Sequence, residues 1–79
     1  MATLALVSTV CPDRAGLVSA ITGTLFDRGV NLRDATFAVM GQGAEFSAVC
    51  DLPETLDLDA LQAELAGLPE LAGAQVRVT

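Results

Sequence analysis

The first apolar segment of the chain, residues 3–11, alternates in the way that is typical of a β-strand. A period of two places Leu4, Leu6 and Val10 on one face of this strand. The opposite face, which includes Cys11, carries small and only half-polar side chains. We therefore expect an N-terminal strand whose second face is small enough for another element to cover.

The pattern then changes to the period of a helix. A turn at residues 12–16 precedes it, and Asp13 is predicted to cap a helix that begins at residue 14 or 15 and ends near Arg28. Gly23 inside this helix indicates close packing, because glycine costs a helix about 1 kcal/mol relative to alanine. Gly29 is expected to end the helix. The apolar stripe repeats at every fourth residue, Leu17, Ile21 and Leu25.

Two further strands are predicted at residues 30–40 and 44–52, joined by a hairpin turn at Gly41–Gly43. In the first of these strands Leu32 and Phe37 should both be buried, although an odd number of positions separates them. A β-bulge, or burial of both faces, would resolve this conflict. The following strand turns four apolar residues to one face, Phe46, Ala48, Cys50 and Leu52.

A second helix and a last strand complete the pattern. Asp57 or Thr55 is expected to cap a helix that ends near Ala66, and residues 74–79 form a short strand. The order β-α-β-β-α-β predicts a single ferredoxin-like α+β domain over residues 1–79, with two helices on one face of a four-stranded antiparallel sheet. The other face of the sheet stays open and invites a partner. The apolar stripe of the second helix is Leu58, Leu61, Leu65 and Leu68.

The two cysteines are predicted to be separate, buried or half-buried thiols. Cys50 should face the core and Cys11 the opposite side of the sheet, so a disulfide between them is not expected. Neither cysteine has a metal-binding spacing, and the chain has no histidine. Because Cys11 precedes a helix N-terminus, a reactive thiol is the alternative interpretation there.

Composition narrows the function classes. Hydrophobic residues make up 52% and charged residues 18% of the chain, which excludes intrinsic disorder. No apolar run reaches the roughly 20 residues that span a bilayer, and the N-terminus lacks the basic region of a signal peptide. We therefore expect a cytoplasmic protein without a membrane partner. A net charge of −6 disfavours direct binding of nucleic acid.

Histidine, lysine, tyrosine and tryptophan are all absent from the sequence. Their absence removes the commonest general bases, the Schiff-base amine and the histidine ligands of metals. The sequence therefore predicts a protein that is not an enzyme and that has neither a metal site nor a cofactor.

The chemistry of the chain is concentrated in the turn between the first strand and the first helix. Free N–H groups at a helix start favour an anion, Gly16 allows close approach to the backbone, and Asp13 adds a carboxylate. Amide donors beside a carboxylate suit a zwitterion such as an α-amino acid. Asn31, at the start of the second strand, offers both a donor and an acceptor. The structural alternatives are a plain N-cap for Asp13 and a turn residue for Asn31.

These residues carry a resemblance to a known family. The sequence CPDRAGLV at residues 11–18 is similar to the turn of ACT domains, in which Cys or Gly precedes Pro-Asp-Arg-Pro-Gly, an aliphatic residue and Val. RGVNL at residues 28–32 resembles the Gly-aliphatic-Asn-aliphatic step of the same family. The chain as a whole resembles stand-alone ACT proteins, including regulators of glycine cleavage, and the N-terminal ACT domains of formyltetrahydrofolate deformylase and serine phosphatase. Ala15 stands where the family usually has proline.

The resemblance implies a regulatory domain that binds a small amino acid or related metabolite at the interface of a homodimer or higher homo-oligomer. Asp13 would contact the polar head groups of the ligand, and Cys11 its side chain. Backbone amides of residues 14–17 would hold its carboxylate, and Asn31 would reach the site from the other subunit. The full set of ligand-binding residues implied is Cys11, Asp13, Arg14, Ala15, Gly16, Leu17, Asn31 and Leu32.

Other functions of the same topology fit less well. An acylphosphatase would need a glycine-rich phosphate loop, whereas Pro12 removes an amide there and Asp13 repels phosphate. A metal carrier would need C-x-x-C, and an RNA-recognition domain needs aromatic residues on a basic sheet face. The main alternative is a ligand-silent interaction or dimerisation module that uses the open sheet face or an edge strand.

Overall fold

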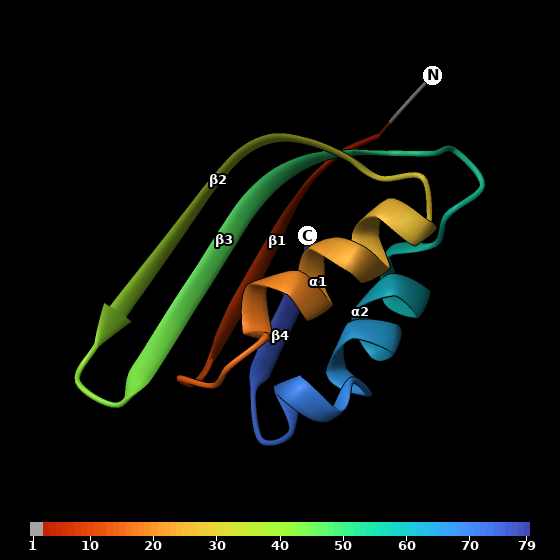
Figure 1. Cartoon of the computed structure of the whole chain (residues 1–79). Helices are drawn as coiled ribbons and strands as arrows, with labels where there is room; N and C mark the ends of the chain where they lie inside the picture. Colours follow the sequence, from red (N-terminus) through yellow and green to blue (C-terminus); the bar gives the residue numbers. More distant parts are fainter. Residues whose placement is uncertain (1–2) are drawn as a thin grey trace.

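The computed structural model describes residues 3–79, which form a four-stranded antiparallel sheet with both helices on one face (Figure 1). The strand order in the sheet is β2-β3-β1-β4, so β2 and β4 are the edges. The predicted ferredoxin-like α+β fold is confirmed. The elements are β1 (Thr3–Pro12), α1 (Leu17–Asp27), β2 (Asn31–Met40), β3 (Gly43–Leu52), α2 (Leu58–Ala66), the 3₁₀ turn η1 (Pro69–Leu71) and β4 (Gln75–Val78).

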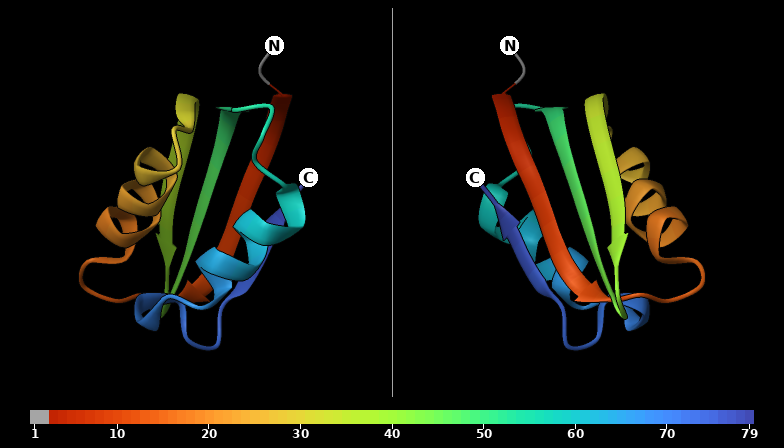
Figure 2. Two further views of the ribbon diagram at one scale, coloured as in Figure 1. Left: turned by 90° about the vertical axis from the view of Figure 1, so that its right-hand side faces the viewer. Right: turned by 90° about the vertical axis from the view of Figure 1, so that its left-hand side faces the viewer.

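The two helices divide the sheet between them. Seen from the side, α1 lies over the β2 and β3 half and α2 over the β1 and β4 half (Figure 2). The β2–β3 hairpin extends beyond the helices, and the molecule is 39 Å along its longest axis. None of the ten residues of β2 is buried.

The core lies between the helices and one face of β1 and β3. The predicted inward face of β3 is confirmed, since Phe46, Ala48, Cys50 and Leu52 are all buried. On β1 the small side chains point inward and the larger leucines outward, because α1 and α2 already fill the core with bulky residues. The buried helix residues are Leu17, Ile21, Leu25, Leu61 and Leu65.

The predicted placement of Cys11 on the face opposite Cys50 is wrong. Both thiols are buried on the helix side of the sheet, and both are free. Cys11 is paired in register with Ala44 and Cys50 with Ala5, six positions apart along the strands. At about 3.4 Å per residue this separates them by roughly 20 Å, which excludes a disulfide for a different reason from the predicted one.

The start of α1 also differs from the prediction. The helix begins at Leu17, and its N-cap is Gly16 in a left-handed conformation with φ of 79° and no side-chain cap. Asp13 does not cap it, because the N-cap lies three positions further on, at Gly16. The backbone amide of Asp13 instead donates to the Gln42 carbonyl oxygen of the β2–β3 turn, at 2.9 Å, which extends the pairing at the end of β1.

The other predicted helix ends are correct. Gly29 has φ of 76° and closes α1 with two bonds, from its own amide to the Phe26 carbonyl and from the Val30 amide to the Leu25 carbonyl. Asp57 caps α2 by accepting the amide of Ala60 at 3.2 Å.

The packing of β2 and of Gly23 was also predicted from the sequence. The predicted bulge in β2 is present, as a register shift between Leu32 and Asp34 that places Phe37 opposite Phe46 on the helix side. Phe37 nevertheless remains 44% exposed, because β2 is an edge strand and its hairpin end extends beyond the helices (Figure 1). The expected close packing at Gly23 is wrong within one chain, since an added Cβ would meet no atom within 4 Å.

Candidate functional site

The β1–α1 turn, residues 13–16, forms an open loop at one end of the sheet. Gly16 adopts its left-handed conformation with no heavy atom within 4 Å of the position of a Cβ. The side chain of Arg14 leaves the loop and donates from Nη1 to the Glu70 carbonyl of η1, at 3.1 Å. Arg14 therefore fixes the turn to η1, whereas Asp13, Ala15 and Gly16 are exposed.

The start of α1 presents amides without acceptors. The Leu17 amide is bonded to the Arg14 carbonyl at 3.4 Å and the Ala20 amide to the Gly16 carbonyl at 2.9 Å. Among the hydrogen bonds within residues 3–79, none uses the amides of Val18 and Ser19 or those of residues 14–16. Their N–H groups, with the positive end of the helix dipole, make this the part of the turn best suited to an anion.

Asp13 is the acidic group at the same turn. Its side chain is exposed, and within the described residues no hydrogen bond or ion pair involves its carboxylate. The structural alternative that sequence reasoning offered, a helix cap, is thus wrong. Within residues 3–79 the carboxylate has no structural partner.

Cys11 lies just below the turn, 6% exposed. Burial raises the pKa of its thiol, with Arg14 opposing and Asp13 adding to the shift. A raised pKa keeps the thiol protonated at neutral pH, which favours the structural interpretation of Cys11 over a reactive one. Burial likewise raises the pKa of Cys50, and Asp51 adds to it.

The predicted site residues do not all converge in one chain. Asn31 pairs with Asp51 near the end of β3, whereas Cys11 pairs with Ala44 near its start, seven positions earlier. This places Asn31 roughly 24 Å along the sheet from the end that carries the turn. Leu32, half-buried beside Asn31, packs against the core. A site that used both the turn and Asn31 would therefore need two copies of the chain.

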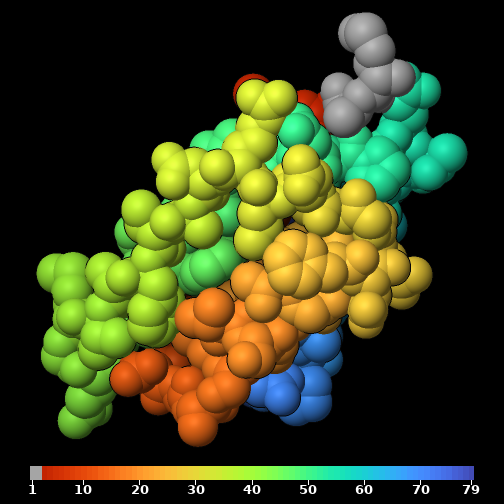
Figure 3. Space-filling view, turned by 45° about the horizontal axis from the view of Figure 1, so that its top comes forward, coloured from red at the N-terminus to blue at the C-terminus, as the bar shows by residue number. Residues whose placement is uncertain are grey.

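One feature of this region escaped the sequence interpretation. Four large hydrophobic side chains on the helix side of β2 and on α1 are exposed: Val18 by 36%, Phe26 by 59%, Phe37 by 44% and Val39 by 51%. Periodicity assigns such residues to the core, and only the strand order reveals that β2 is an edge. Figure 3 shows the side of the molecule on which α1 and β2 lie next to each other.

Within residues 3–79 no group of three or more acidic, cysteine or histidine side chains is arranged to hold a metal ion. No helix in that range has the length and hydrophobicity needed to cross a bilayer.

The fold and the turn define a class of small α+β domains, and comparison with known proteins gives the family. Residues 5–70, most of the chain, match the ACT domain family, so the chain belongs to it. ACT domains are regulatory, ligand-binding domains. No curated protein matches the sequence.

Solved structures with the same fold include an ACT domain protein from Streptococcus pneumoniae, with a TM-score of 0.84 and 22% identity over 100% of this chain and 90% of that one. The ACT domain from GTP pyrophosphokinase of Chlorobium tepidum gives 0.75 and 20%, covering 100% of this chain and 97% of that domain. A formyltetrahydrofolate deformylase from Pseudomonas putida gives 0.86 and 19% over 98% of this chain. The chain spans only 28% of that deformylase.

Proposed function

We propose that this chain is a non-catalytic cytoplasmic regulator that senses a small amino acid, or a related metabolite, at a site shared by two copies of the chain. The observation that carries the proposal is the β1–α1 turn. It combines amides without acceptors with an exposed carboxylate, Asp13, that has no hydrogen-bond or ion-pair partner among the described residues. Two free thiols suit the reducing cytoplasm.

The chemistry of the turn matches both ends of an α-amino acid. The amides of Gly16, Val18 and Ser19 offer donors to the ligand carboxylate, and Asp13 offers an acceptor to its ammonium group. Gly16 allows the ligand to approach the backbone, because no side chain or neighbouring atom fills that space. A simple anion such as phosphate suits the turn less well, since Asp13 would repel it.

The second half of the site would come from another copy that pairs antiparallel along the free edge of β2. A two-fold axis at the middle of β2 would place Asn31 of that copy opposite Met40, which pairs with Gly43 and, through it, neighbours Pro12. Asn31 would then lie three strand spacings, about 14 Å, from Pro12 at the start of the turn. This gap suits a small ligand together with the side chains that hold it.

The surface beside β2 supports this arrangement. Arg28 on α1 pairs with Glu64 on α2 at 2.8 Å, so that side of α1 faces α2. At about 100° per residue, Phe26 lies about 160° and Val18 about 80° around the helix from Arg28, so both are turned away from the Arg28 position. With Phe37 and Val39 they form an exposed apolar flank that a second copy would bury.

Regulation would follow from linkage. A ligand held by residues of two subunits binds the dimer and not the monomer, so it shifts the association equilibrium toward the dimer. A partner that recognises the dimer would then respond to the concentration of the amino acid.

The first experiment is thermal unfolding of the chain in the presence of each of the twenty amino acids. At a ligand concentration of about 100 times Kd, a ligand that binds only the folded state adds about 2.7 kcal/mol. In a domain of this size that corresponds to a rise in Tm of roughly 10 to 20 °C.

The Asp13→Ala variant should lose this shift and keep the stability of the ligand-free protein, because Asp13 caps nothing. Asp57→Ala is the matched control. It should lose about 1 kcal/mol through the α2 cap and keep the ligand shift in full. A ligand shift that survives in Asp13→Ala would contradict the assigned site, and no shift with any amino acid would favour a ligand-silent interaction module.

A further inference from the structure

A hollow of about 500 Å³ lies on the face of the sheet away from the helices, between β1 and the edge strand β4. It is lined by Ser8 and Val10 of β1 and by Gln75, Val76 and Arg77 of β4. Ser8 pairs in register with Arg77. Val10 pairs with Gln75 in the next row, so all four side chains project from one face of the sheet. The hollow therefore opens between two long side chains of β4 and two shorter ones of β1.

Arg77 is the cation of this hollow. The other three arginines are engaged elsewhere, Arg28 and Arg33 in ion pairs and Arg14 on a backbone carbonyl. Within residues 3–79 no ion pair or hydrogen bond involves the guanidinium of Arg77, although the chain has ten acidic residues against four arginines. A guanidinium offers five N–H donors in a planar fork that matches a carboxylate. Arg77 is therefore available to an anion from outside the chain.

Two neutral polar side chains stand next to Arg77. Among the side-chain hydrogen bonds of the described residues, none uses the hydroxyl of Ser8 or the amide of Gln75. Gln75 lies two positions from Arg77 on the same strand, about 7 Å away, and Ser8 lies about 5 Å away on the neighbouring strand. A group of the size of a carboxylate fits between these three side chains and can accept a hydrogen bond from each.

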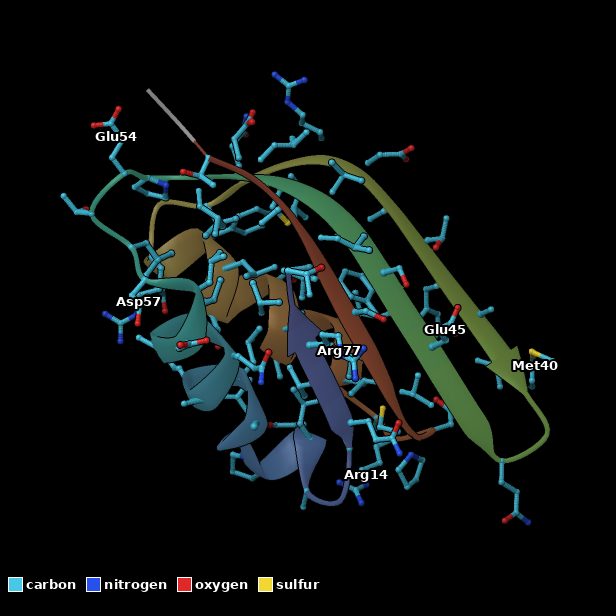
Figure 4. The ribbon with its side chains drawn as sticks, turned by 180° about the vertical axis from the view of Figure 1, so that it is seen from behind. Arg14, Met40, Glu45, Glu54, Asp57 and Arg77 are labelled. Carbon is cyan, nitrogen blue, oxygen red and sulfur yellow. The ribbon has the colours of Figure 1, made fainter. Side chains whose placement is uncertain are left out.

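The remaining surroundings limit the kind of anion. Val10, in the wall of the hollow, is 47% exposed, and Leu6 on the other side of Ser8 is 44% exposed, so hydrocarbon laid against them would be removed from water. Glu45 stands on β3 in the same row as Val10, where it opposes a doubly charged anion more than a singly charged one. Figure 4, which views this face, shows Arg77 on β4 and Glu45 apart from it on β3. The hollow therefore suits a single carboxylate that carries a short apolar chain.

We propose that this hollow binds a small aliphatic carboxylate, held by Arg77 together with Ser8 and Gln75. The hydrocarbon chain of the ligand lies against Val10. No carboxylate lines the hollow, so it offers no counter-charge to an ammonium group, and an acid without an α-amino group fits better than an amino acid. The site is thus separate from the β1–α1 turn, where Asp13 supplies that counter-charge, and it does not depend on the function proposed for the turn.

Titration with sodium hexanoate, followed through the backbone amide signals in NMR spectra, tests this site. Hexanoate should give saturable shifts confined to residues 8–10 and 75–77. Arg77→Gln should weaken its binding by about tenfold or more, because the charged hydrogen bonds to the carboxylate are lost. Arg33→Gln is the matched control: it removes the same charge at an exposed arginine that is paired with Asp51, and it should leave the affinity unchanged. Acetate, inorganic phosphate and norleucine, which is hexanoate with an α-amino group, should each bind more weakly at these residues.

Saturable shifts between β1 and β4 that are lost in Arg77→Gln and kept in the control support the site. No saturable shift with hexanoate, equal binding to the Arg77→Gln protein, or shifts at residues 13–19 instead would each overturn it. Acetate or phosphate that binds as tightly as hexanoate would overturn the assigned ligand class and leave an unselective anion surface. The Tm shift with amino acids, measured on the Arg77→Gln protein, reports the proposed amino-acid site separately, because Asp13 is intact in that variant.

Discussion

Replacement of Thr9 by valine should stabilise the protein. Thr9 is the one polar residue among the fully buried side chains of residues 3–79, and its hydroxyl has no hydrogen-bond partner there. Burial of an unpaired hydroxyl costs about 1–3 kcal/mol, and valine has nearly the same shape. We expect Thr9→Val to raise the free energy of unfolding by about 1–2 kcal/mol. For a domain of this length that corresponds to a rise in Tm of about 4 to 16 °C.

The assay is thermal and urea unfolding at one fixed protomer concentration, because association would otherwise shift the midpoint. Thr3→Val is the matched control on the same strand and on the same parity of positions. Thr3 is exposed, so its replacement should change stability by no more than about 0.5 kcal/mol. A neutral or destabilising effect of Thr9→Val, beside a neutral control, would refute the reasoning and indicate that the hydroxyl is hydrogen-bonded in solution.

Three further substitutions test α1, its C-terminal turn and the ion pair that joins it to α2. Gly29→Ala should destabilise the protein by about 1 kcal/mol or more, as read from urea midpoints, because φ is 76° and the new Cβ would lie 3.4 Å from Pro53. Gly23→Ala should stabilise the isolated chain by up to about 1 kcal/mol in the same assay, because nothing lies near its Cβ. The hydrogen bond from Arg28 lowers the pKa of Glu64 in the folded protein. The stabilisation by this ion pair is therefore present above the pKa of Glu64 in the unfolded chain and is lost as the pH falls through the pKa in the folded protein. In Glu64→Gln the free energy of unfolding should accordingly fall less steeply as the pH is lowered.

Much of the fold could be predicted because local signals agreed with the tertiary structure. Asp57, Gly29 and the leucine stripe of α2 are local features, and each produced the predicted element. The bulge in β2 was correctly predicted as one of two solutions. Leu32 and Phe37 both favour burial but are separated by an odd number of positions, so in a regular strand they would lie on opposite faces.

The incorrect predictions concern features that depend on distant contacts. The inward face of β1 carries the smaller residues, because the helices fill the core, and alternation alone does not reveal which face that is. The Asp13 amide bonds to Gln42, almost thirty positions along the chain, and the helix that Asp13 was expected to cap begins only at Leu17. Phe37 is exposed because strand order makes β2 an edge.

The candidate site could be predicted only in part for the same reason. The turn motif predicted unpaired amides at the start of α1, and the structure has them, whereas Asp13 was expected to cap the helix and does not. The distance between the turn and Asn31 follows from the register of β1, β2 and β3, which no local pattern contains. The family resemblance had already implied that Asn31 comes from another subunit, and that assignment stays a prediction.

The central claim is that one ligand site combines Asp13 of one subunit with Asn31 of another. Its most direct test is calorimetric titration, with an amino acid that stabilises the wild type, of the Asp13→Ala protein, the Asn31→Ala protein and an equimolar mixture of the two after subunit exchange. Each variant alone should bind no ligand. The mixture should recover about one site in four, because half of the dimers are mixed and each of these contains one intact site. No recovery in a mixture whose subunits have exchanged would contradict a shared site.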